Sequence, residues 1–168
     1  MTEVTLTVDK DSVLTEVAKT TSYAGKKMDG DDDAYDRIFT TDADREMLER
    51  FWSESQIAVC EQLKKQLADE QTKDNGDWEI KLCLSQSFDT TLENSMNKEL
   101  VSFFVMNIVA KWFAFCNKKE AGNYGTAANE LLVGVHKKAL YKKRPTRPTY
   151  VTKPAEPDKG GEGEEDLK

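Results

Sequence analysis

The side chains best suited to binding chemistry are cations near the end of the chain. Residues 137–147 contain six lysines and arginines and no acid. The cluster consists of Lys137, Lys138, Lys142, Lys143, Arg144 and Arg147. One or two cations at a helix C-terminus complement the helix dipole, and six exceed that need. We therefore predict a docking site for an acidic protein surface or for nucleic acid, since the cluster suits carboxylates and phosphates alike.

The segment that follows this cluster resembles a docking arm. Prolines at positions 145, 148, 154 and 157 favour an extended, polyproline-like chain that loses little entropy on binding. Tyr150 and Val151 are suited to anchor such an arm in a groove, or to add a strand to a partner's sheet. The final residues, "PDKGGEGEEDLK", have the composition of a disordered, solvating tail. We predict that residues 145–168 form this arm and tail, with Tyr150 and Val151 in the binding site.

Catalytic chemistry has little support in the sequence. His136 is the only histidine, and it lies between Val135 and Lys137 in a helical pattern, which favours a structural role. The chain has no nucleophile elbow, phosphate-binding loop, dinucleotide fingerprint or metalloprotease motif. We therefore expect no catalytic residues and no cofactor. A small enzyme with an unrecognised carboxylate pair stays as an alternative, because the chain contains 31 acidic residues.

Two further residue groups resemble metal or redox sites. The run "MDGDDDAYD" is rich in carboxylates, but the sixth position counted from Asp29 is Ala34, where a calcium loop needs glycine. We interpret this run as a solvated linker. The three cysteines, Cys60, Cys83 and Cys116, are far apart and form no CxxC pair. They suggest a reducing compartment and small buried side chains, and no metal site is expected.

Two strands are expected to form part of a small sheet in the domain. Residues 3–8 and 78–85 both alternate apolar and polar side chains, which is typical of half-buried strands. "KDNGD" at 73–77 predicts a turn before the second strand. A third strand is expected either from residues 149–152 or from a neighbouring subunit, because a two-stranded sheet alone is marginally stable.

Helical periodicity predicts four helices. The first is capped by Asp11 or Ser12 and ends near Gly25, and the second covers residues 42–71 with a capping box at its start. The buried stripe of the second helix is Leu48, Phe51, Trp52, Ser55, Val59, Gln62, Leu63 and Leu67. Residues 95–118 predict a central helix that is apolar almost all round, with a thin polar strip. Glycines in "NKKEAGNYG" are expected to end the central helix before a last helix at 126–143.

Length and composition fit one globular domain at residues 1–144. The chain has 168 residues, 33% of them charged, and a net charge of −7, which argues against a general nucleic-acid coat. We see no signal peptide. The apolar segment 100–116 is shorter than a membrane span, so we expect a core helix and no membrane partner. The fold class is predicted as α+β and mostly helical, with about four helices packed on a two- or three-stranded antiparallel sheet.

Four stretches resemble small structural proteins of tailed phages and prophages of Bacteroides-type bacteria. They are "DAYDRIFTTDADREMLERFW", "WEIKLCLSQSFDTTLENS", "FFVMNIVAKWF" and "LYKKRPTRP", which together extend from about residue 33 to 149. In general plan the chain is similar to the helical head–tail connector, or adaptor, proteins that form rings beneath the portal. Those proteins have no catalytic residues to carry over.

The resemblance implies a non-enzymatic virion protein in the neck or tail. Its partners would be further copies of itself in a ring, portal or tail proteins, and packaged DNA, with the host cytoplasm as its place during assembly. Connectors are mainly helical, and the two predicted strands depart from that plan, which leaves a tail-completion role open. The alternative is a monomeric adaptor or regulator that binds an acidic protein or nucleic acid through the basic arm.

Overall fold

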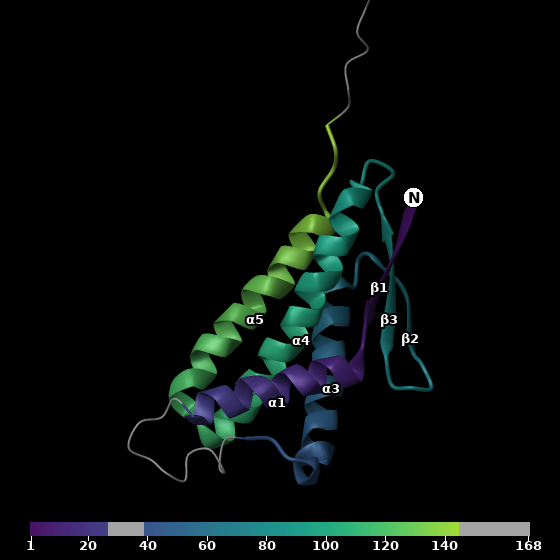
Figure 1. Ribbon diagram of the computed structural model, residues 1–168. Coiled ribbons are helices and arrows are strands. Elements are labelled where there is room, and N and C mark those ends of the chain that lie inside the picture. Colours follow the sequence, from purple (N-terminus) through teal and green to yellow (C-terminus); the bar gives the residue numbers. More distant parts are fainter. Residues whose placement is uncertain (27–38, 145–168) are drawn as a thin grey trace, which may run out of the picture.

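The computed structural model describes residues 1–26 and 39–144 of the chain. These residues form four α-helices, two short 3-10 helices and a three-stranded antiparallel sheet. Figure 1 shows the sheet at one side of the molecule and the helices packed beside it. The predicted α+β fold with about four helices is confirmed.

Two of the strands are those that the alternating pattern predicts. Strand β1 (Thr2–Val8) pairs antiparallel with β3 (Trp78–Leu84) along its whole length, from Thr2 opposite Leu84 to Val8 opposite Trp78. Their alternate apolar side chains are buried on one face. The strand order is β1-β3-β2, so β3 is central and the other two strands are edges.

The third strand, β2 (Leu67–Thr72), shows that the helix predicted through residue 71 is too long. The sequence analysis expected a third strand from residues 149–152 or from a neighbouring subunit, and residues 149–152 lie outside the described residues. The helix instead ends at Leu63, and the chain turns back onto β3. Within the predicted turn, the Gly76 amide donates to the Lys73 carbonyl at 2.8 Å, and Gly76 has a φ of +87°. Glycine adopts this left-handed conformation without steric cost, so it closes the β2–β3 hairpin.

Helices α1 (Lys10–Lys26) and α3 (Arg45–Leu63) lie between β1 and β2 in the order of the chain. The Asp9 carboxylate accepts from the Ser12 amide at 2.6 Å, so Asp9 caps α1, and the caps expected two or three residues later, at Asp11 or Ser12, are wrong. The short helix η1 (Asp42–Asp44) leads into α3, and the predicted capping box between Thr41 and Asp44 is present. The buried side of α3 is the predicted stripe from Leu48 to Leu63.

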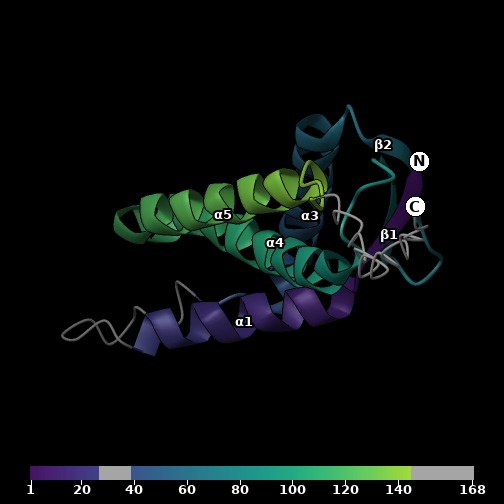
Figure 2. The same cartoon turned by 90° about the horizontal axis from the view of Figure 1, so that it is seen from above.

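Helix α4 (Glu93–Cys116) follows the short helix η2 (Thr90–Leu92) and is the centre of the fold. It contacts α1, α3, α5 and β1, and Figure 2 shows α4 between α1 and α5. By length and composition, residues 90–116 would also suit a membrane span. Here nine of its side chains are buried and it packs against other elements on several sides, as its nearly continuous apolar surface predicts for a core helix.

Aromatic side chains join the sheet to the helices around α4. The Phe104 ring lies 4.6 Å from the Trp52 ring of α3 and 5.5 Å from the Trp78 ring of β3, measured between centroids. Trp78 is 1% exposed and Phe104 is fully buried. This cluster belongs to one continuous hydrophobic core to which β1, β3 and every α-helix contribute, and the half-buried Leu67 of β2 packs against it.

Helix α5 (Lys118–Ala139) is longer at its start and shorter at its end than the predicted helix 126–143. It begins directly after Asn117, which ends α4, and continues through Gly122 and Gly125. Helices α4 and α5 form the most extensive contact between two elements. That packing outweighs the low helix propensity of the two glycines.

Candidate interaction surfaces

The structure divides the predicted cationic cluster into two kinds of residue. Lys137, Lys142, Lys143 and Arg144 are exposed, whereas Lys138 is half-buried. Arg147, Tyr150 and Val151 lie outside the described residues. The predicted site is therefore brought together only in part, at the C-terminal end of α5.

Lys138 is occupied by contacts within the domain. Its ammonium donates to the Ser95 hydroxyl at 2.7 Å and to Oε1 of Glu99, both on α4. The other carboxylate oxygen of Glu99 is buried and has no hydrogen-bond partner among the described residues. Lys138 therefore holds a partly desolvated carboxylate at the α4–α5 contact, and its role is structural.

The chain beyond α5 is fixed against the loop after β3. The Tyr141 amide donates to the Lys138 carbonyl at 3.0 Å, and the Lys143 amide donates to the Ser87 carbonyl at 2.7 Å. The pKa of Asp89 is lowered, mainly by hydrogen bonds from Thr91 and to a lesser extent by the charge of Lys143. These contacts hold residues 141–143 in place beside the sheet.

Two apolar side chains are exposed among these cations. Leu140 is 53% exposed and Tyr141 is 50% exposed. We call this surface the cationic end, and it consists of Lys137, Leu140, Tyr141, Lys142, Lys143 and Arg144. Among the described residues, none of its four cations forms an ion pair with a carboxylate, unlike Lys138. An aromatic ring and a guanidinium on an otherwise hydrated surface are typical of the residues that anchor macromolecular interfaces.

A second surface lies between α3 and the edge strand β2. A half-open groove of about 430 Å³ is lined on one side by α3 and on the other by β2, with Trp78 at its base. Its α3 side consists of Ser53, Gln56, Ile57, Cys60 and Glu61. Its β2 side consists of Glu70, Gln71 and Thr72. Ile57 is 67% exposed, so a large apolar side chain of α3 has little cover there. We call this surface the α3–β2 groove.

One carboxylate organises the base of the α3–β2 groove. Glu70 Oε2 accepts from the Cys60 thiol at 3.0 Å and from the Trp78 indole N–H at 3.3 Å. Burial and the neighbouring Glu70 charge raise the pKa of Cys60 to about 12. The thiol is therefore protonated at neutral pH and serves as a hydrogen-bond donor, since nucleophilic cysteine chemistry uses the thiolate.

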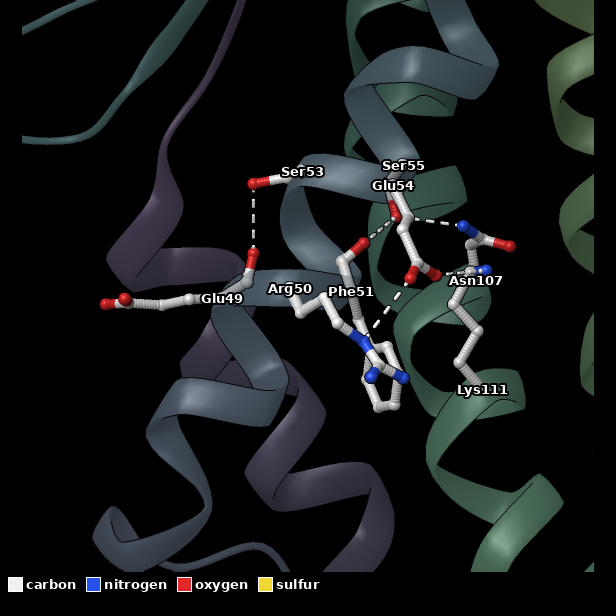
Figure 3. A network of polar contacts seen from close by, with 8 residues as sticks. All are labelled: Glu49, Arg50, Phe51, Ser53, Glu54, Ser55, Asn107 and Lys111. Carbon is white, nitrogen blue, oxygen red and sulfur yellow. Dashed lines mark hydrogen bonds and ion pairs between the residues drawn. The ribbon is translucent and has the colours of Figure 1, made fainter.

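The polar strip predicted on the central helix binds α3. Asn107 donates to the Ser55 hydroxyl at 2.8 Å, and that hydroxyl donates to the Phe51 carbonyl at 2.8 Å. Lys111 donates to Glu54 at 2.7 Å, and Figure 3 shows the Glu54 carboxylate between Lys111 and Arg50. The Lys111 hydrogen bond lowers the pKa of Glu54. Every buried polar group of this strip has a partner, so the strip aligns two helices.

His136 has a comparable structural contact. Its Nδ1 lies 3.1 Å from the side-chain nitrogen of Gln62, so the ring connects α5 to α3. Among the described residues, no group of three or more His, Cys, Asp or Glu side chains is placed to hold a metal ion. The acidic run "MDGDDDAYD", residues 28–36, lies outside the described residues.

Comparison with protein-family models, with curated proteins and with solved structures finds no match for this chain. The α3–β2 groove was missed by sequence reasoning. The features that point to it are the turn "KDNGD" and the exposed Ile57, which lies off the apolar stripe of α3.

Proposed function

We propose that this chain is a non-enzymatic assembly subunit that docks on an acidic partner through its cationic end. The observation that carries the proposal is the set of four exposed cations without an ion-pair partner among the described residues, beside the exposed Leu140 and Tyr141. Opposite charge on a partner steers its approach and fixes its orientation, while burial of the apolar side chains adds affinity.

The anchoring of this surface supports a docking role. Lys137 lies in the last turn of the 22-residue helix α5, and the other three cations follow that helix. The Lys143 amide is hydrogen-bonded to Ser87 at the end of the sheet. A surface that is ordered before binding loses less conformational entropy when a partner arrives. The predicted arm at residues 145–168 would extend the same surface with Arg147, Tyr150 and Val151.

The specific role that we propose is a ring-forming head–tail connector or tail-completion subunit of a tailed phage. Its support is the resemblance of four sequence stretches to phage structural proteins, together with two features that suit a ring. These features are the predicted extended arm and the two edges of the sheet that the structure describes, which a neighbouring copy can complete. Its partners would be further copies of the chain, portal or tail proteins and packaged DNA.

A monomeric adaptor or regulator is the alternative function. Lysines and an arginine beside the exposed Tyr141 also suit nucleic acid, because cations neutralise phosphates and an aromatic ring stacks on bases. The two functions differ in their dependence on salt. Nucleic-acid binding through several phosphate contacts should fall steeply with salt, whereas a ring held partly by apolar contacts and strand pairing should be less sensitive.

Charge reversal at both ends of α5 tests the docking proposal. Lys142→Glu with Lys143→Glu should block assembly with the partner and leave the far-ultraviolet circular dichroism unchanged, because both side chains are exposed. The matched control is Lys118→Glu with Lys119→Glu, which makes the same change in net charge at the other end of the helix. Equal assembly by the two variants would contradict the proposal.

A further inference from the structure

The backbone of strand β2 presents an open edge to the α3–β2 groove. The Lys73 amide donates to the Asp77 carbonyl at 2.8 Å, so the backbone groups of Lys73 face the partner strand. In an antiparallel pair, residues whose backbone groups face the partner strand alternate with residues whose backbone groups face away from it. Thr72 and Glu70 then occupy the positions whose backbone groups face away from β3. The Glu70 amide is bonded locally to the Asp69 carboxylate at 2.9 Å. Within the described part of the chain, the Thr72 amide and the Glu70 carbonyl have no hydrogen-bond partner and are available to another strand.

Two side chains of this edge lie on the same side of the sheet as α3. Thr72 and Glu70 lie opposite Trp78 and Ile80, so their side chains are on the face of the sheet that α3 covers. The same two residues line the groove together with Ile57, which is 67% exposed. A fourth strand beside β2 would fill the groove and cover Ile57 with its own side chains.

We propose that the α3–β2 groove accepts residues 149–153 of a second copy as a fourth strand. This inference rests on the proposed assembly function. This segment, "TYVTK", contains no proline and is bounded by Pro148 and Pro154. Threonine, tyrosine and valine favour strands, and the segment's five residues are one fewer than the six of β2. Alternate side chains would place Tyr150 or Val151 against Ile57.

Charge complementarity supports this occupant. The groove and its edge carry the carboxylates of Asp69 and Glu70 and that of Glu61, which is paired with Lys64. Among the described residues, no lysine or arginine lines the groove. The segment is flanked by Arg147 and contains Lys153. The arm thus brings positive charge to an acidic edge, and its backbone supplies the hydrogen bonds.

The direction of the chain favours a second copy over the same copy. Lys143 is fixed to Ser87, near the end of the sheet where β2 begins. An arm that started there and entered its own groove would run parallel to β2, in a sheet that is antiparallel throughout. The arm of a second copy can enter antiparallel, which gives the slightly more stable pairing.

Photo-cross-linking of the full chain tests this inference. Benzoylphenylalanine is placed at position 150, and isotope-labelled and unlabelled copies are mixed and illuminated at high protein concentration. We expect cross-links between labelled and unlabelled copies that end in residues 53–61 or 67–72. Cross-links within one copy only, cross-links elsewhere, or none between copies would overturn the proposal.

A proline pair supplies the matched control. Thr72→Pro removes the free amide of the β2 edge and should lower the yield of these cross-links about tenfold, without breaking the β2–β3 ladder. Thr5→Pro makes the same change at the outward edge of β1, where the Thr7 amide already bonds Asn97, and should leave the yield unchanged. An unchanged yield in Thr72→Pro would overturn the inference.

Two further results separate this inference from the proposed function. If Thr72→Pro fails to fold, Ile57→Asp replaces it, because that side chain is exposed and should be dispensable for the fold. If charge reversal at the cationic end blocks assembly while both groove variants cross-link normally, the groove proposal fails and the assembly function stands. If the charge-reversal variant assembles normally while both groove variants lose the cross-links, the groove proposal stands and docking through the cationic end fails.

Discussion

Replacing Lys138 separates a structural cation from the exposed ones around it. In Lys138→Met the side chain keeps its length, but Glu99 loses the ammonium that binds its Oε1. Its other oxygen is already buried without a partner in the described part of the chain, so the variant leaves a poorly solvated carboxylate between α4 and α5. Gly134 lies close to this carboxylate, because a Cβ there would be 3.1 Å from Glu99 Oε2, and the side chain has little room to turn toward water.

The magnitude follows from the exposure of the pair. A hydrogen bond to a charged group stabilises by about 1.5–3 kcal/mol when it is buried. The Lys138 and Glu99 side chains are 25% and 29% exposed, so water screens part of that interaction. We expect Lys138→Met to lower the free energy of unfolding by about 1–2 kcal/mol, which corresponds to a decrease in Tm of roughly 2–8 °C for a chain of this size.

Urea unfolding followed by circular dichroism measures this loss. Lys137→Met is the matched control, because Lys137 is the neighbouring residue, is exposed and has no ion pair among the described residues. It should change the free energy of unfolding by less than about 0.5 kcal/mol. Glu99→Gln in the Lys138→Met background should recover part of the loss, since a neutral amide is less costly to bury. Equal stability of the two lysine variants would refute this reasoning.

Two other predictions concern the hairpin and the α3–α4 contact. Gly76→Ala forces alanine into a left-handed conformation and should lower the free energy of unfolding in urea by about 1–2 kcal/mol. Gly122→Ala lies in open space on a helix and should raise that free energy by up to about 1 kcal/mol. A change of the same sign in both variants would contradict the hairpin geometry. The pKa of Glu54 is lowered from 4.5 by its hydrogen bond with Lys111, so that bond stabilises the fold above this value and is lost as the pH falls through the folded pKa. The stability difference between the wild type and Lys111→Met should therefore shrink between about pH 7 and about pH 3, and a constant difference would show that the contact does not depend on the charge of Glu54.

Strong local patterns in the sequence were sufficient to predict most of the fold. Alternation predicted β1 and β3, and helical spacing predicted the buried stripe of α3. Strand β2 was missed because all but its first residue are exposed, so its side chains show no alternation. Its position is fixed by pairing with β3 and by the turn at Gly76, and neither effect produces a pattern within residues 67–72.

The candidate surfaces were predictable only in part. Sequence identified the cations but did not distinguish Lys138 from Lys137, because the difference lies in Glu99, which is 39 residues from Lys138 in the chain. The start of α5 was placed too late because glycines near Gly122 suggested a break. The groove beside Ile57 could not be predicted while β2 was assigned to a helix.

Quantitative mass spectrometry of tailed-phage particles from the strain that encodes this chain tests the proposed function most directly. The proposal of a ring-forming neck or tail subunit predicts the chain in purified particles, at a copy number that fits one ring around the portal. Its absence from clean particles would contradict the virion role.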